Sequence, residues 1–331
     1  MNRTSSQRRA GATIAATTVV LLALTGCASS PSDTPETPSA TEELTTVRLA
    51  LNNTSSSLAA VVAEQKGIFE AHGIDIQSEV LADITKIPPA LGNQFDIGFG
   101  VQPIIINGAA QGLDTVVISG NGWSSRESTD MLVVVPEDSD IETFADLQGR
   151  TLGAPTLTGN LHYATLYKFV EEGFDPDSVN QVQVATPAML DQLEQGVIDA
   201  AELQQPFITL AEASGMRVLG YTLDSVADPV GMSVWISSGT WATENEETIY
   251  AYRAAIDDAV AWMEENPDET KQILADFTGQ DIALVEQAPI PRFDSHYAVA
   301  DLEVWDSVLR TVAGFNGTVD YSSLVVFPSA G

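Results

Sequence analysis

The chain has 331 residues and a formal net charge of −32 at pH 7, because 46 acidic residues outnumber 14 basic ones. This excess of negative charge excludes a nucleic-acid-binding surface and a basic membrane-binding face, since both partners are themselves anionic. Hydrophobic residues make up 44% of the sequence, and a single cysteine excludes an intrachain disulfide. Length and composition predict a globular protein large enough for two lobes.

The N-terminus has the features of a bacterial export signal. Three arginines within the first nine residues precede an apolar run at 10–24, and the stretch LTGC at 24–27 resembles the lipobox of bacterial lipoproteins. The run is shorter than the roughly 20 residues that a membrane-spanning helix needs. We therefore expect a signal peptide over residues 1–26 and a lipid on Cys27. The Arg8–Arg9 pair leaves open whether export follows the general or the twin-arginine route.

The residues after the cysteine predict a tether. Residues 28–43 hold three prolines, many hydroxyl groups and several acids, but no large apolar side chain. Such a segment cannot bury enough surface to fold, so residues 27–43 are expected to form a lipidated, disordered leash.

Short apolar strands alternate with helical stretches from Val47 onward. Strands are predicted at 47–52, 75–81, 95–100, 114–120 and 131–136, with helices at 58–73, 85–93 and 103–111. A second round predicts strands at 151–155, 182–185, 198–203 and 216–220, with helices from about 160 to 172, over the stretch PAMLDQLEQG and at 205–215. This alternation predicts an α/β fold of two lobes, each a mainly parallel sheet flanked by helices.

The chain is then expected to return to the first lobe and become mostly helical. A strand is predicted at 232–238, followed by a long helix whose apolar residues recur every three or four positions and which ends before Pro267. We assign lobe 1 to residues 44–136 plus 232–331 and lobe 2 to residues 137–231, with hinge crossings near 136–139 and 227–231. The apolar residues of the helical part are predicted to be core: Ile249, Tyr252, Ile256, Ala259, Met263, Leu302, Trp305, Leu309 and Val312.

Four stretches resemble one family, the nitrate/sulfonate/taurine-type and thiamine-pyrimidine-synthase-like substrate-binding proteins. They are AEQKGIFEAHGIDI at 63–76, PALGNQFDIGFG at 89–100, FADLQGRTLGAP at 144–155 and LDQLEQGVIDAAELQQPF at 190–207. The resemblance implies a two-lobed type II periplasmic-binding-protein fold. Together with the lipobox-like stretch at 24–27, it leads us to expect a lipid-anchored monomer on the extracytoplasmic face of the cell membrane. Such a protein delivers a small solute to the membrane permease of an ABC importer, which a separate ATPase drives.

The sequence departs from the family pattern at two points. Gln205 stands before the Pro-Phe pair, where the family often has glutamate, so this segment does not fix the ligand class. The cysteine-rich iron motif of the pyrimidine-synthase enzymes is missing, because Cys27 is the only cysteine. The solute is expected to be a sulfonate-, carboxylate- or nitrate-like anion, or alternatively a neutral or aromatic heterocycle such as a thiamine-pyrimidine precursor.

Ligands of open α/β sheets lie beyond the carboxyl ends of the strands. The loops after residues 52, 100, 120, 155, 185 and 203 are therefore expected to surround a cleft between the lobes. Their candidate ligand-binding residues are Asn52, Thr54, Ser55, Ser56, Gln102, Trp123, Arg126, Thr156, Thr158, Gly159, Asn160, Glu202 and Gln204.

Several of these candidates have a structural alternative. Hydroxyl groups at a helix start hold an anionic or carbonyl oxygen of a ligand, or simply cap the helix. Trp123 packs on the ligand or in the core. Arg126 pairs with an acidic group of the ligand, or with its neighbours Glu127 and Asp130.

The sequence gives little support for catalysis. His72, His162 and His296 are far apart and match no metal-ligand spacing, and no GxSxG or GxxxxGK[ST] motif occurs. We expect no metal, no cofactor and no catalytic residue. Two alternatives stay open, an enzyme that holds a cofactor aldehyde on Lys66 or Lys168, and a lipoprotein sensor that presents its ligand to a receptor.

Overall fold

The computed structural model describes residues 44–129 and 131–326. The predictions for the signal peptide, for Cys27 and for the tether up to residue 43 lie outside the described residues. Within the described part, no helix combines the length and the apolar character needed to cross a membrane.

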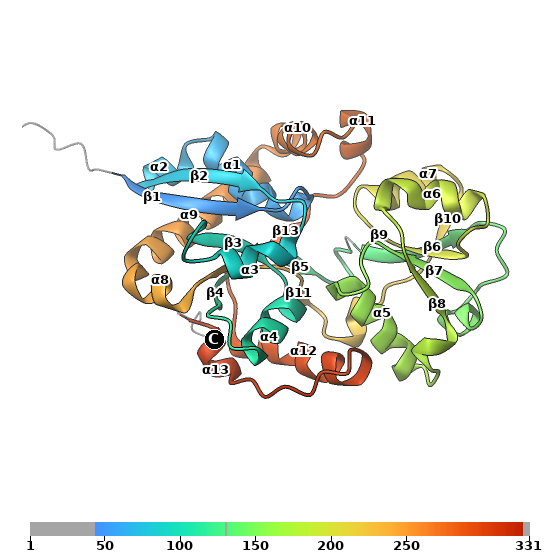
Figure 1. The fold of residues 1–331 in the computed structure, drawn as a ribbon. Coiled ribbons are helices and arrows are strands. Elements are labelled where there is room, and N and C mark those ends of the chain that lie inside the picture. The colour runs from blue at the N-terminus through green and yellow to red at the C-terminus, as the bar shows by residue number, and fades with distance from the viewer. Residues whose placement is uncertain (1–43, 130, 327–331) are drawn as a thin grey trace, which may run out of the picture. The chain divides into compact units, whose positions relative to one another are not determined.

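The first sheet has the strand order β2-β1-β3-β12-β4 (Figure 1). Strands β2, β1 and β3 are parallel, and β12 runs antiparallel to both of its neighbours. Apolar residues dominate β1, β3, β4 and β12, and the last three of these strands are completely buried, whereas the edge strand β2 is largely exposed. The strands are β1 (Thr45–Leu51), β2 (Ile74–Val80), β3 (Ile97–Gly100), β4 (Val116–Gly120) and β12 (Val234–Ser237).

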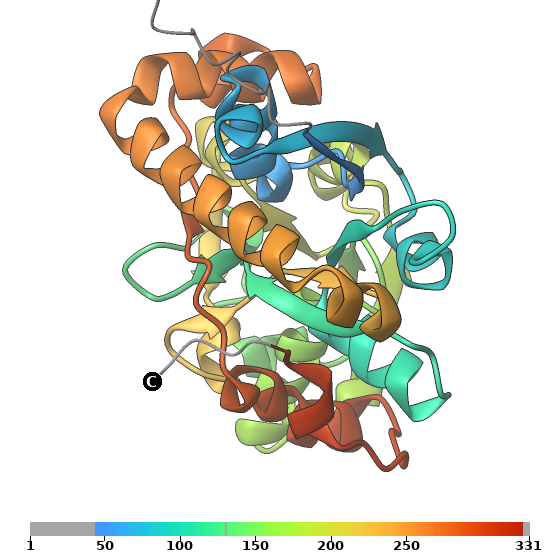
Figure 2. The same cartoon turned by 90° about the vertical axis from the view of Figure 1, so that its left-hand side faces the viewer.

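Helices from both ends of the chain accompany the first sheet. Helix α9 packs against α1 and α2, and Figure 2 shows α9 as the long orange helix beside the blue α1. The helix predicted at 58–73 is interrupted at Gly67, whose φ of +67° only glycine adopts readily. These helices are α1 (Leu58–Gln65), α2 (Ile68–Ala71), α3 (Ile87–Ala90), α4 (Gln102–Ala110), α8 (Gly239–Glu244), α9 (Glu246–Glu265), α10 (Pro267–Thr278), α11 (Ile282–Val285), α12 (Val299–Val312) and α13 (Tyr321–Leu324).

The second sheet repeats the order of the first. Its order β8-β7-β9-β6-β10 matches β2-β1-β3-β12-β4 position by position, and β6 is the antiparallel strand that corresponds to β12. The strands are β6 (Met131–Pro136), β7 (Thr151–Ala154), β8 (Asn180–Gln183), β9 (Ala200–Gln204) and β10 (Met216–Gly220), and the helices beside them are α5 (Asn160–Glu171), α6 (Thr186–Glu194) and α7 (Phe207–Ala213).

Strand β6 corrects the predicted lobe boundary. The sequence analysis placed Met131–Pro136 in lobe 1, but β6 pairs with β9 and β10 of the second sheet. The chain therefore crosses to the second sheet between β5 and β6, before the predicted position, and crosses back between β10 and β11. The prediction failed because an apolar run shows that a strand is buried but not in which sheet it pairs.

A third sheet of three short strands was not predicted. It consists of β5 (Gly122–Ser124), β11 (Val230–Gly231) and β13 (Arg292–Phe293), with β5 in the centre. Two-residue and three-residue strands carry no periodic signal, and their partners lie more than a hundred residues apart. This sheet lies where the two crossings leave and re-enter the first lobe.

The predicted core of the helical part is confirmed. Ile249, Tyr252, Ile256 and Ala259 on α9 are completely buried, and Met263 is nearly so. On α12, Leu302, Trp305 and Leu309 are completely buried, whereas Val312 is only partly buried against the core.

Candidate functional site

A cavity of about 720 Å³ lies between the first and second sheets. Its walls are the loops that follow β1, β2 and β3 in one lobe and β7, β8 and β9 in the other, so corresponding strand ends face one cavity. The antiparallel strands β12 and β6 begin at the same edges, which places Met232 and Met131 in the lining. The expectation that ligands lie beyond the carboxyl ends of the strands therefore describes this cavity.

Eight of the thirteen candidate residues line the cavity. All eight come from the loops after β1, β7 and β9, and none of them belongs to the segment around 120–130. They are Asn52, Thr54, Ser56, Thr156, Thr158, Gly159, Asn160 and Gln204.

The loop after β1 is held by its own side chains. The Asn52 amide donates to Thr54 Oγ1 at 2.7 Å and accepts from Ser57 Oγ at 2.5 Å. Thr54 Oγ1 also accepts from the Ser56 backbone N–H at 3.3 Å, which caps the short 3-10 helix Ser55–Ser57. Local capping and a place in the cavity wall therefore occur together here.

The loop after β7 leads into α5. Thr158 N–H donates to Thr156 Oγ1 at 3.3 Å, and Gly159 is the N-cap of α5 with no side-chain cap. A Cβ on Gly159 would lie 2.7 Å from Thr156 Cγ2, so a larger residue would require the Thr156 side chain or the loop to shift. The first backbone N–H groups of α5 and the positive end of its dipole therefore lie at the cavity wall.

Asn160 and Gln102 join the two lobes behind the cavity. Asn160 Nδ2 donates to Gln102 Oε1 at 2.7 Å and to the Met232 carbonyl at 2.8 Å. Gln102 Nε2 donates to the Gly231 carbonyl at 3.0 Å and to Tyr297 Oη at 3.2 Å. Gln102 is completely buried, so it holds the lobes together and does not line the cavity.

Trp123 and Arg126 lie outside the cavity lining. Trp123 Nε1 donates to the Asp294 carbonyl at 3.3 Å, and its ring packs 6.2 Å from that of Tyr297, which is the predicted core alternative. Arg126 pairs with Asp224 and, at 3.6 Å, with Asp228, so it connects the two crossing segments. These acids are not the sequence neighbours that the sequence analysis considered.

Ser55 and Glu202 are also absent from the lining, and Glu202 has a different environment. It is completely buried on β9, and its Oε1 lies 3.0 Å from His162 Nδ1. His162 Nε2 lies 3.1 Å from Gln181 Oε1, and Gln181 Nε2 donates to the Pro176 carbonyl at 3.0 Å, which fixes the orientation of that amide. Both ring nitrogens of His162 thus face acceptors, as a protonated imidazole requires.

The titration of His162 follows from this arrangement. Burial alone would lower the pKa of His162, but the negative charge of Glu202 and the hydrogen bonds with Glu202 and Gln181 together raise this pKa above its ordinary value. His162 lines the cavity through the start of α5, yet its charge is compensated by Glu202.

Sequence reasoning missed the largest apolar part of the cavity. The loop after β2, from Leu81 to Thr85, and the side chains Phe99, Val101 and Ile104 all line it. The position of β2 gave a usable signal, because its carboxyl end lies beside that of β1 in a parallel pair. The sequence analysis counted the other strand ends and passed over this one.

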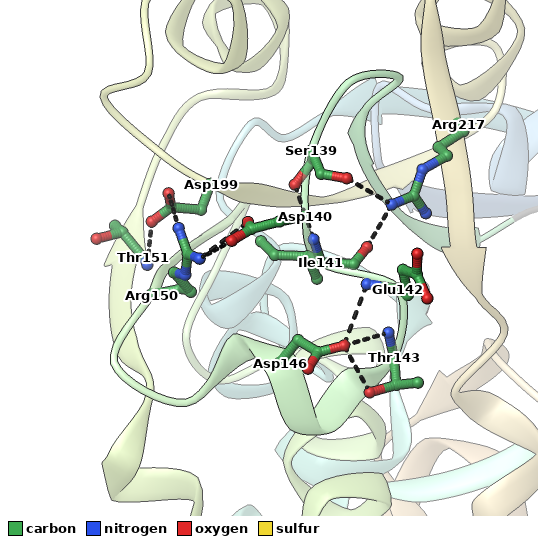
Figure 3. A network of polar contacts seen from close by, with 10 residues as sticks. All are labelled: Ser139, Asp140, Ile141, Glu142, Thr143, Asp146, Arg150, Thr151, Asp199 and Arg217. Carbon is green, nitrogen blue, oxygen red and sulfur yellow. Dashed lines mark hydrogen bonds and ion pairs between the residues drawn. The ribbon is translucent and has the colours of Figure 1, made fainter.

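Within the stretch at 144–155 that carries the family resemblance, the charged residues are structural. Figure 3 shows Arg150 bonded to both carboxylate oxygens of Asp140, at 2.9 and 2.7 Å, and directed toward Asp199. Asp146 accepts from the backbone N–H and the hydroxyl of Thr143, each at 2.8 Å, and these bonds lower its pKa. This network fixes the entry to the second sheet, and its residues are absent from the cavity lining.

The lysines considered as attachment points for a cofactor have partners outside the cavity. Lys66 pairs with Glu269 and lies 4.7 Å from the centre of the Trp262 ring, and Lys168 lies 3.8 Å from Glu172. Neither lysine lines the cavity. Over residues 44–129 and 131–326, no cluster of three or more His, Cys, Asp or Glu side chains is arranged to hold a metal ion.

Comparison with known proteins agrees with this architecture. A Brucella abortus protein, named only as a candidate binding protein, is 27% identical over 231 residues, which cover 68% of this chain and 69% of that protein. The Escherichia coli periplasmic aliphatic sulphonate binding protein SsuA has a similar structure, with a TM-score of 0.73, 18% identity and coverage of 85% of this chain and 97% of that one. The desulfurization enzyme DSZB is also similar, with a TM-score of 0.60, 19% identity and coverage of 86% of this chain and 97% of that one.

These structural likenesses establish the periplasmic-binding-protein fold, which enzymes and binding proteins share. The model of the family described as NMT1/THI5 like matches residues 54–270, a span that contains the whole second sheet and most of the cavity wall. The chain belongs to the NMT1/THI5-like family.

Proposed function

We propose that the protein is the extracytoplasmic solute-binding component of an ABC importer, which captures a small organic solute between its two lobes and delivers it to a membrane permease. The observation that carries this proposal is the cavity of about 720 Å³, whose wall is built from corresponding strand ends of both lobes. This volume lies within the roughly 300–1,000 Å³ typical of small-molecule sites. A solute that touches both lobes favours the arrangement in which they are closed around it.

The lipid anchor is part of the same proposal. The LTGC stretch at 24–27 supports attachment through Cys27, and the Pro-rich and acidic residues that follow support a leash between the membrane and the lobes. The bound solute would then reach a permease in the same membrane, with a separate ATPase supplying the energy.

Binding without catalysis is the activity that the cavity supports best. Its lining holds one imidazole, and both nitrogens of that ring already face acceptors within the protein. The lysines considered for an enzyme lie outside the lining and pair with carboxylates. The likeness to a desulfurization enzyme concerns the fold, and no described cavity residue supplies a thiol nucleophile.

Native mass spectrometry of the full chain, purified without added ligand, tests the proposal. We expect a retained solute that is released by unfolding and raises the melting temperature when it is added back to the emptied protein. Thr156→Trp, which places a large side chain in the cavity wall, should abolish both effects. Thr243→Trp, on the exposed surface of α8, should leave them intact. A chain that retains no solute and is stabilised by none would contradict the proposal.

A further inference from the structure

The cavity lining carries very little charge. Asp83 and His162 are its titratable residues, and no lysine or arginine belongs to it. Three of the 14 basic residues lie within the first nine positions, and each of the others has a partner in the described structure. Lys86 follows the lining residue Thr85 in sequence, but its exposed side chain lies 3.7 Å from Asp83, so this cation accompanies a carboxylate.

His162 cannot serve as the missing cation. Its Nδ1 faces Glu202 at 3.0 Å and its Nε2 faces Gln181 at 3.1 Å, so neither N–H is left for a ligand. The buried Glu202 also balances its charge. With His162 paired with Glu202 and Asp83 accompanied by Lys86, the lining offers no uncompensated positive charge to an anionic solute, on a chain that already carries −32.

Two buried hydrogen-bond acceptors without a partner belong to the cavity residue Asn160 and to Glu202, which contacts the cavity residue His162. They are Asn160 Oδ1 and Glu202 Oε2. The amide orientation of Asn160 is not arbitrary, because Gln102 Nε2 donates to the Gly231 carbonyl and so presents its oxygen to Asn160 Nδ2. Both oxygens are buried and do not themselves contact a solute, but their negative charge or partial charge disfavours an anion bound nearby.

The first lobe supplies most of the apolar lining of the cavity. Leu81, Ile84, Phe99, Val101 and Ile104 contribute to it, while uncharged hydroxyl and amide groups line the cavity from both lobes. Apolar surface together with neutral polar groups suits a solute with an apolar body and an uncharged polar end. A fully ionised group would lose its hydration here without gaining a cationic partner.

The start of α5 favours a hydrogen-bond acceptor on the solute. The first N–H groups of α5, at Asn160 and the residues that follow, lie at the cavity wall beside the buried Asn160 Oδ1. These backbone donors, together with lining amide and hydroxyl side chains that can accept, suit the C=O and N–H groups of an amide. A helix end stabilises negative charge only modestly, so these donors do not replace a missing lysine or arginine.

We infer that the cavity takes an uncharged, partly apolar organic solute with an amide-type edge, in preference to a sulfonate, carboxylate or nitrate. This inference rests on the proposed function and names the chemical class of its solute. The sequence analysis named an anionic solute first and a neutral one as the alternative. The order changes because helix starts and hydroxyl groups are visible in the sequence, whereas the partners of the cations are not.

A series of probes on one ring system tests the class. Naphthalene-2-carboxamide, naphthalene-2-carboxylate and naphthalene-2-sulfonate share their apolar body and differ in charge and donors. Titration calorimetry on the full chain, freed of retained solute, should show the carboxamide binding at least tenfold more tightly than either anion. Asp83→Asn should narrow this gap by improving the binding of the anions.

A pair of isoleucine variants tests the apolar wall. Ile104→Ala, in the cavity lining, should weaken carboxamide binding severalfold, whereas Ile76→Ala, a partly buried position on β2 outside the lining, should not. Melting temperatures without ligand show whether either variant has lost its fold.

The outcomes separate the two proposals. Tighter binding of the sulfonate or the carboxylate overturns the solute class and leaves the binding function standing. Absence of binding by every probe, together with no retained solute in native mass spectra, overturns the binding function itself. Carboxamide binding that Ile104→Ala leaves unchanged places the solute outside this cavity and overturns the inference.

Discussion

Asn160 at the start of α5 donates to Gln102 at the start of α4 across 2.7 Å, so the first helical residues after β7 and β3 meet between the lobes. Both side chains are buried, and both make further bonds to the segment at Gly231 and Met232, where the chain re-enters the first lobe. The contact therefore involves both lobes and one of the two crossings.

Removing the side chain of Asn160 or Gln102 should destabilise the protein, because the other residue is left buried without its hydrogen-bond partner. In Asn160→Ala, the Gln102 oxygen loses its donor, and the expected cost is about 1–3 kcal/mol in the free energy of unfolding. Urea unfolding of both single variants and the double variant should give a coupling of about 1 kcal/mol. Strictly additive effects would show that the two side chains do not act as a pair.

The buried His162–Glu202 pair predicts a pH dependence. Since the pKa of His162 is raised by folding, its contribution to stability is complete below the unfolded value of about 6.5 and is lost as pH rises through the folded value. The free energy of unfolding should therefore fall above about pH 6.5 more steeply in the natural protein than in His162→Gln. This comparison cancels the titration of surface groups that the two proteins share.

The His162–Glu202 pair also predicts that a double variant is more stable than the sum of the two single losses would give. His162→Gln leaves the Glu202 carboxylate buried without its cation, which should cost about 3 kcal/mol. In the double variant with Glu202→Gln, the two amides can bond to each other, and much of that loss should be recovered. A double variant as unstable as the sum of the single ones would contradict the ion-pair assignment.

Arg126 should matter little for ligand affinity. It lies outside the cavity and its side chain is 66% exposed, so Arg126→Met should change the dissociation constant of the retained solute less than twofold and cost at most about 1 kcal/mol of stability. Isothermal titration of the two proteins checks this, with Thr156→Trp as the variant that blocks binding. A large loss of affinity in Arg126→Met would restore the ligand role considered from sequence.

Gly120 at the end of β4 should tolerate no side chain. A Cβ there would lie 2.3 Å from the His296 carbonyl oxygen and 2.5 Å from that of Asp294, and backbone cannot yield as a flexible side chain does. Gly120→Ala should lower stability by about 3 kcal/mol or more. Gly108→Ala in α4 is the matched control, because its nearest neighbour is the Leu113 side chain at 3.2 Å.

Cys27 should decide where the protein is found. In a bacterial host that lipidates exported proteins, the natural chain should sediment with membranes, and Cys27→Ala should appear in the extracytoplasmic soluble fraction. Mass spectrometry of the N-terminal peptide would show whether the diacylglycerol is present. Equal membrane association of both proteins would refute anchoring through this thiol.

The sequence allowed most of the architecture to be predicted, because alternation of strands and helices is a local signal. Eight of the thirteen candidate residues line the cavity, since strand ends and hydroxyl-rich helix starts are visible in the chain. The surroundings of Gln102, Glu202 and Trp123 could not be predicted, because their partners lie far away in sequence at Gly231, His162 and Asp294. Such residues look available for a ligand until the fold supplies their partners.

The position of β6 and β12 constrains the order in which the protein can form. Residues 131–220 supply every strand of the second sheet in one continuous piece, and its ends are neighbours because β6 and β10 pair antiparallel. The first sheet instead needs β12 between β3 and β4, and β12 is made only after the whole second sheet. During synthesis the second lobe can thus complete its sheet while the first still lacks an inner strand, and the cavity between them is finished last.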